Sequence, residues 1–148
     1  MKRVPIFLLL LLLLISAAAI AADKVEGIKS CKQCGMDRAT FAYSRMLIIY
    51  ADGTSTGTCS LNCAVTELKA NRGKRVKTLM AADYSTKELT DAGSANWVIG
   101  GKKTGVMTSL AKWAFVRKED AQRFVKENDG RVTTFAEALD LALKENEQ

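Results

Sequence analysis

The longest hydrophobic stretch of the chain lies at its N-terminus. An almost unbroken aliphatic run covers residues 4–15, with two cationic residues before it and a series of alanines after it. This order is typical of a secretory signal peptide, and the run is shorter than the roughly 20 residues that span a membrane. We therefore expect a signal peptide at residues 1–21, cleaved after Ala21. The alternative is an uncleaved N-terminal anchor.

The next part of the chain has the pattern of a hairpin followed by a helix and a strand. Apolar and β-branched residues on both sides of Asp52-Gly53 predict two strands joined by a tight turn. Asn62 is a candidate helix N-cap, and Gly73 is a stop signal. The expected elements are strands at 41–50 and 54–58, a helix between Asn62 and Gly73, and a strand at 75–79.

The second half of the chain repeats this alternation. Residues 85–88 have the form of a capping box, which predicts a brief helix before Gly93, and a second capping box starts the last helix at Thr134. Apolar residues at helical spacing mark a helix at 118–128. The expected strands are 97–100, 103–108, 112–117 and 131–135.

The two halves match each other at a shift of 56 residues. Residues 59–79 then align with residues 115–135, and Arg-Val-x-Thr-apolar follows the helix in both. We interpret this as an internal duplication, with coincidence between two amphipathic helices as the alternative. The prediction is an α+β fold of two small ββαβ lobes, at about 31–80 and 95–148. Lobes this small bury little core alone, so they should pack together or rely on a metal.

The amino-acid composition excludes several kinds of catalytic and metal-binding site. The 148 residues include no histidine, which excludes Ser-His-Asp and Cys-His catalytic pairs and every imidazole metal ligand. A metal would have to be held by sulfur or oxygen. The net charge of +6 falls to +4 when Lys2 and Arg3 are removed with the signal peptide, and this charge is mild, so we expect no nucleic-acid partner.

The candidate chemistry lies in four cysteines. Cys31 and Cys34 form a C-x2-C pair, Cys59 and Cys63 form a C-x3-C pair, and 24 residues lie between the two pairs. This spacing is typical of a four-thiolate metal site. Met36 adds a thioether beside the first pair, and a mixed cysteine and methionine set favours Cu(I) over harder ions.

Other roles for the cysteines remain open at this point. Four thiolates also suit structural Zn(II). In an exported protein, an even number of cysteines is often a disulfide framework. A redox-active C-x2-C is a third reading, but such a motif normally ends a strand and opens a helix, whereas a hairpin follows here.

Several segments resemble the NosL family, the accessory copper-binding proteins of nitrous oxide reductase. They are Cys34-Gly35-Met36 with the aromatic-rich hairpin, the segment 105–108 with Met107, and the tail at 115–124 with Gly130-Arg131-Val132. The resemblance covers nearly all of residues 22–148. It implies a two-lobed ββαβ fold and Cu(I) binding in the bacterial periplasm, with Cys34, Met36 and Met107 as ligands.

The sequence departs from the family in two respects. Members are typically lipoproteins, whereas the residues before Cys31, Ile28-Lys29-Ser30, do not form a lipoprotein cleavage site. Cys59 and Cys63 lie outside the core NosL pattern and resemble a segment of cysteine-rich heavy-metal-binding modules. The predicted metal ligands are therefore Cys34, Met36 and Met107, joined by Cys31, Cys59 and Cys63.

The leading interpretation is a non-enzymatic periplasmic metallochaperone for Cu(I). The resemblance implies a copper-accepting partner such as nitrous oxide reductase or its assembly complex, and no stable membrane insertion after signal cleavage. The alternative is a structural module of the periplasm, held together by Zn(II) or by disulfides.

Overall fold

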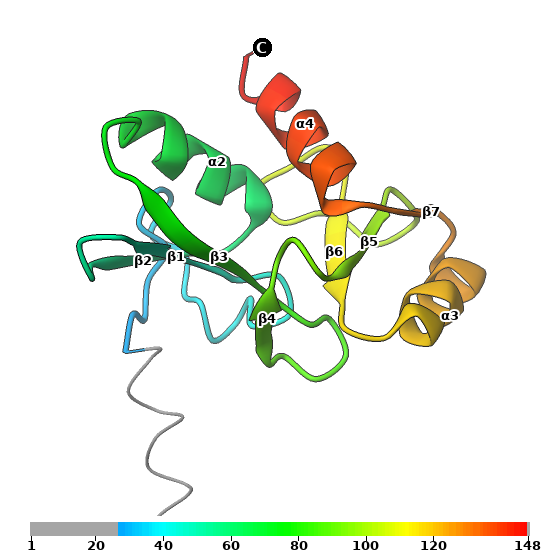
Figure 1. The fold of residues 1–148 in the computed structure, drawn as a ribbon. Coiled ribbons are helices and arrows are strands. Elements are labelled where there is room, and N and C mark those ends of the chain that lie inside the picture. Colours follow the sequence, from blue (N-terminus) through cyan, green and yellow to red (C-terminus); the bar gives the residue numbers. More distant parts are fainter. Residues whose placement is uncertain (1–26, 148) are drawn as a thin grey trace, which may run out of the picture.

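The structure, a computed structural model, describes residues 27–147 (Figure 1). The predicted signal peptide at residues 1–21 lies outside this range. Within it, three helices and two antiparallel sheets are present, which confirms the α+β class. None of the helices in the described range has the length and apolar character needed to cross a membrane.

The first sheet is built around the predicted hairpin. Its four strands lie in the order β2-β1-β3-β4, and β1 pairs antiparallel with both β2 and β3. The turn uses Gly53 at φ 84°, a left-handed conformation that glycine adopts readily. The elements are β1 (Met46–Tyr50), β2 (Ser55–Thr58), α2 (Leu61–Ala70), β3 (Val76–Ala82) and β4 (Leu89–Asp91).

The second sheet has three strands and repeats the arrangement of β2, β1 and β3. Its strands lie in the order β6-β5-β7, again with the first strand of the unit in the centre. The elements are β5 (Asn96–Ile99), β6 (Lys112–Phe115), α3 (Lys118–Asn128), β7 (Arg131–Thr133) and α4 (Phe135–Glu145). Both units thus have the order ββαβ, but a long loop at 100–111 replaces the tight turn of the first hairpin.

Two of the predicted elements are wrong. Residues 85–88 form a turn instead of a helix, because the Asp83 carboxylate accepts hydrogen bonds from the amides of Ser85 and Thr86, at 2.6 and 2.9 Å. Residues 103–108 are not a strand. They belong to the long loop, whose start is bent by Gly100 and Gly101, both at positive φ.

Two boundaries also differ from the prediction. The first strand begins at Met46, since residues 41–44 form turns. The N-cap of α2 is Ser60 and not Asn62: the Ser60 hydroxyl accepts a hydrogen bond from the Cys63 amide at 3.3 Å. Asn62 lies inside the helix, and its side chain reaches the other lobe, where its amide donates to Glu145.

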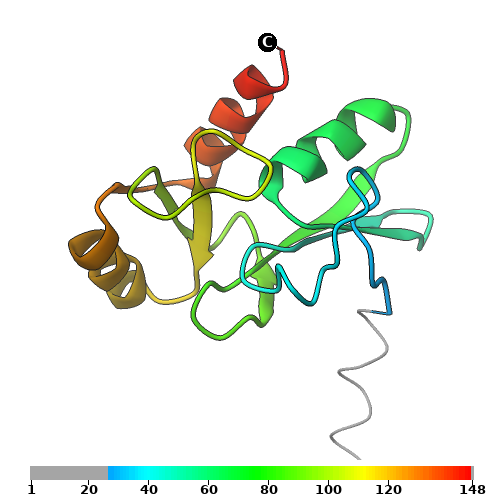
Figure 2. The ribbon, with the colours of Figure 1, turned by 180° about the vertical axis from the view of Figure 1, so that it is seen from behind.

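The two lobes share their cores. One apolar cluster joins Ile48 and Val65 of the first lobe to Trp97 and Ala138 of the second. The other cluster joins three of the cysteines to aromatic residues that include Trp113 of β6. Seen from behind, the segment before β1 and the 100–111 loop lie on the same side of the molecule (Figure 2). The predicted packing of lobe on lobe is therefore what the structure has.

Candidate metal centre

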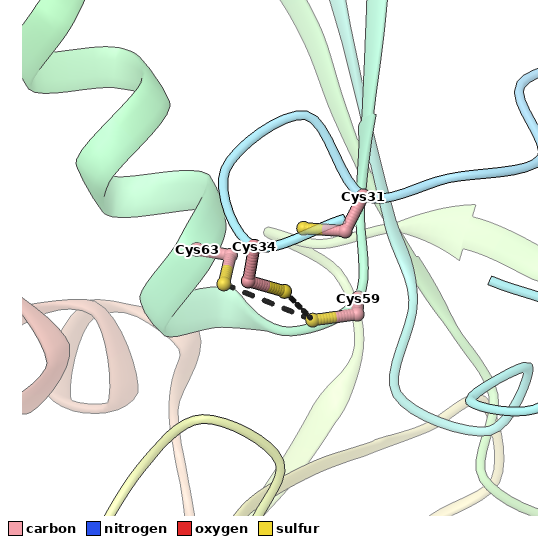
Figure 3. Close-up of side chains that lie close together, drawn as sticks. All are labelled: Cys31, Cys34, Cys59 and Cys63. Carbon is pink, nitrogen blue, oxygen red and sulfur yellow. Dashed lines mark hydrogen bonds between the residues drawn. The ribbon is translucent and has the colours of Figure 1, made fainter. Parts of the chain in front are cut away.

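The first pair of cysteines lies in a tight turn before β1. The Gly35 amide donates to the Cys31 carbonyl at 2.9 Å, and the Cys31 amide donates to the Met36 carbonyl at 2.8 Å. Gly35 has φ 75° and thus allows the chain to reverse without strain. The turn brings both cysteine side chains to one side, as Figure 3 shows.

This turn is fixed to the first lobe at two points. The Lys32 amide donates to the carbonyl of Gly57 in β2 at 3.0 Å. The Gln33 side chain donates to the carboxylate of Glu67, which is buried in α2. The C-x2-C pair is therefore held against both the strand and the helix that flank the C-x3-C pair.

The second pair lies at the junction of β2 and α2. Cys59 directly follows β2, and its carbonyl accepts a hydrogen bond from the Ser44 hydroxyl at 2.8 Å. Cys63 is in the first turn of α2, where the helix dipole and the free amides favour a thiolate. The predicted position of Cys63 is confirmed.

The four sulfur atoms converge (Figure 3). All four Sγ atoms lie within 4.8 Å of one another. The Cys34 and Cys59 sulfurs are 3.4 Å apart, and the Cys59 and Cys63 sulfurs are 3.7 Å apart. A tetrahedral ion with metal–sulfur bonds of about 2.3 Å sets its ligands about 3.8 Å apart, so one ion fits among the four with small adjustments.

Access to the sulfurs is unequal. Cys31, Cys59 and Cys63 are buried, at 3%, 0% and 5% exposure, whereas Cys34 is half-buried. An incoming ligand therefore meets Cys34 first.

The thiols differ in acidity. A hydrogen bond from Cys59 lowers the pKa of Cys63 to about 6, against the opposing effect of burial, and the Ser60 hydroxyl acts in the same direction. The pKa of Cys59 is raised, because it shares that proton with Cys63 and is itself buried. Burial also raises the pKa of Cys34. Cys63 is therefore more acidic than Cys34 and Cys59, and a metal would displace the protons that the thiols still hold.

The two predicted methionine ligands are in different environments. Met36 is partly buried and packs against the apolar cluster that contains the cysteines. Met107 is 52% exposed and lines a pocket of about 220 Å³ together with Cys63. Metal ligation by all six sulfur residues stays a prediction.

A charged network beside Cys63 was not found from the sequence. The Lys112 ammonium is buried and pairs with Glu145 and with Asn62, which directly precedes Cys63. Burial alone would raise the pKa of the Glu145 carboxyl, but hydrogen bonds from Lys112 and the 108–109 loop hold it well below its usual range. The sequence carries no local signal for this network: Lys112 shares a strand face with Ala114, and only the structure shows that both faces of this strand are buried.

The fold and the site together define a small α+β protein that contains two ββαβ units, in which four thiols converge beside the first unit. A sequence model of the NosL family matches residues 22–141, and the chain therefore belongs to the NosL family.

Comparison with solved structures supports the fold. The crystal structure of the copper chaperone NosL from Shewanella denitrificans superposes with a TM-score of 0.59 at 21% sequence identity. The match covers 76% of this chain and 91% of that one. Among curated proteins, no relative matches.

Proposed function

We propose that this protein is a copper chaperone that binds Cu(I) as cargo and passes it to a copper-accepting protein. The observation that carries the proposal is the convergence of four thiols within 4.8 Å in a chain without histidine. Thiolates are the soft ligands that Cu(I) prefers. Membership of the NosL family and the likeness to a copper chaperone point in the same direction.

Transfer proceeds by ligand exchange at the exposed edge of the site. Cu(I) is stable with two or three ligands, which leaves a position open for a ligand of the partner. Cys34 is the one half-buried thiol of the four, so the partner's sulfur or nitrogen enters there. Met36 and Met107 act as accessory ligands near Cys34 and Cys63. The protein performs no catalysis in this role.

The partner and the compartment follow from the family. The acceptor is nitrous oxide reductase or its assembly complex, and delivery takes place in the periplasm after removal of residues 1–21. The C-x2-C turn lies before a strand instead of opening a helix, which does not match the arrangement typical of thioredoxin-like redox motifs.

A second candidate function is structural. Three of the four thiols are buried, and two of the sulfur–sulfur distances, 3.4 and 3.7 Å, are close to the edge of a tetrahedral zinc–thiolate site. A resident Zn(II), or a disulfide between Cys34 and Cys59, would then stabilise a module whose function is to bind another protein.

An anaerobic Cu(I) titration against a competing chelator tests the two candidates. The reduced protein is compared with Cys34→Ser and with Cys59→Ser/Cys63→Ser, and folding is followed by circular dichroism. A chaperone predicts tight one-to-one binding that is lost in Cys34→Ser while the fold is kept. Weak copper binding, or unfolding of both variants with loss of zinc, would favour the structural role.

A further inference from the structure

A pocket joins the thiol site to the second lobe. It has a volume of about 220 Å³ and lies between the start of α2, the 100–111 loop and the end of α4. In Figure 2 this loop is seen next to both helices. Cys63 of the first lobe and Met107 of the second line the same pocket. The two sulfur residues come from different lobes, so the distance between them depends on contacts between the lobes.

A buried ion pair lies where the two lobes meet. The Lys112 side chain is 2% exposed and pairs with Glu145 near the end of α4. Its ammonium also donates to the Asn62 side chain at 3.2 Å and to the Thr108 hydroxyl at 3.0 Å. Asn62 directly precedes Cys63, and Thr108 directly follows Met107. The pair therefore contacts the immediate neighbour of each pocket-lining sulfur residue.

Glu145 also closes the loop that carries Met107. Its carboxylate accepts hydrogen bonds from the amides of Ser109 and Leu110 at 3.0 and 3.2 Å, and from the Thr108 hydroxyl at 2.7 Å. One side chain thus binds the three residues that follow Met107.

The backbone at Met107 is strained. Its φ of 53° is left-handed, a conformation that a non-glycine residue keeps only where its surroundings enforce it. The packing around Gly105 is equally tight, since a Cβ there would lie 2.4 Å from the Thr108 side chain. The loop is held in one conformation that places Met107 at the pocket, and strain of this kind points to a function.

We propose that Glu145 and Lys112 are positioning residues that hold the Met107 loop against the Cys63 end of α2, so that sulfur ligands from both lobes reach one metal ion. The proposal rests on the copper-binding function above. A buried ion pair adds little stability compared with apolar side chains of similar size. Its value here is geometric, because the pair with its hydrogen bonds allows only one arrangement of loop and helix.

The test combines two measurements on the reduced protein and its Glu145→Gln variant. Hydrogen exchange of the Ser109 and Leu110 amides, measured without metal, should accelerate at least about tenfold when the carboxylate is lost. The Cu(I) affinity should fall by about tenfold, the usual size of the effect for groups that orient metal ligands. Met107→Leu should weaken binding similarly, and the double variant Glu145→Gln/Met107→Leu should bind no more weakly than Met107→Leu, because both changes remove the same ligand.

Glu137→Gln is the matched control. It breaks the exposed ion pair with Arg131 at the other end of α4 and should leave both measurements unchanged. If Glu145→Gln does not fold, Thr108→Val replaces it, since this variant removes only the hydroxyl that both charged groups contact. A loss of several-fold in affinity is then expected.

Two outcomes would overturn the inference, and they are distinguishable. A wild-type protein that binds no Cu(I) contradicts the chaperone function and the positioning role together. Tight wild-type binding that stays unchanged in Glu145→Gln, or additive losses in the double variant, contradicts the positioning role alone.

Discussion

The sulfur atoms of Cys34 and Cys59 lie 3.4 Å apart although 25 positions separate the residues in the chain. They belong to different motifs, so this contact joins the N-terminal turn to the junction of β2 and α2. This contact determines how the site responds to oxidation.

Mild oxidation of the metal-free protein should link Cys34 to Cys59. The two sulfurs need to approach by only about 1.4 Å to reach the disulfide length of about 2.0 Å, and Cys34 is the thiol that an oxidant reaches first. Peptide mapping by mass spectrometry identifies the pairing. Copper loading should protect the thiols, and a product that contains mainly Cys31–Cys34 would contradict the geometry.

Ser60→Ala should weaken the start of α2 and reduce the acidity of Cys63. The variant removes the N-cap hydroxyl that accepts from the Cys63 amide, at a loss of about 1 kcal/mol of stability. It also raises the pKa of Cys63, since the Ser60 hydroxyl helps to lower it. Urea unfolding and thiolate absorbance at 240 nm measure the two effects. Ser55→Ala, at an exposed position in β2, is the control and should change neither.

The stability of the reduced, metal-free protein should increase between pH 6 and pH 9. The pKa of Cys63 is about 6 in the folded state and about 9 in the unfolded chain, so the unfolded state binds one more proton in this interval. The gain is at most about 1.4 kcal/mol per pH unit, and it is lost as the pH falls through 6. Above pH 9 the raised pKa of Cys59 reverses the trend.

This interval is favourable for the measurement because the chain contains no histidine that titrates in it. Urea unfolding at several pH values gives the slope. Cys63→Ser should flatten the increase between pH 6 and 9. A variant that retains the full slope would show that another group is responsible.

Replacement of the two predicted methionine ligands separates copper from zinc. Met36→Leu and Met107→Leu should each weaken Cu(I) binding by roughly tenfold, because a thioether is a ligand for Cu(I) and not for a closed zinc–thiolate site. Met80→Leu, on the partly buried strand β3, is the control. Zn(II) affinity should be the same in all three variants. If neither Met36→Leu nor Met107→Leu changes the Cu(I) affinity, the methionines are not ligands and the cysteines alone bind the metal.

Local signals in the sequence were sufficient where one interaction dominates. The range of α3 was predicted correctly at 118–128, and Thr134 was recognised as the N-cap of α4, where its hydroxyl accepts from the Glu137 amide. The spacing of the cysteines also indicated their convergence. For the two helices the decisive contacts lie within a few residues, and for the cysteines the two short motifs have the spacing typical of a shared metal site.

Prediction from the sequence failed where a residue outside the local motif forms the decisive interaction. The pattern at 85–88 is that of a capping box, but Asp83 upstream captures the amides that would start the helix. The ion pair of Lys112 and Glu145 joins residues 33 positions apart, and no local pattern predicts it. Hydrophobic periodicity does not show which charged residue will be buried, because the partner that neutralises it comes from another element.

The repeated ββαβ unit has a further consequence. At the shift of 56 residues, Cys59 and Cys63 correspond to Phe115 and Glu119. Phe115 is buried in the same cluster as the cysteines, so one copy of the unit supplies Cys59 and Cys63 and the other supplies an aromatic residue of the surrounding cluster. The two halves thus share an architecture but contribute differently to the site: a cysteine at position 115 would replace a buried ring of this cluster, whereas position 119 is exposed.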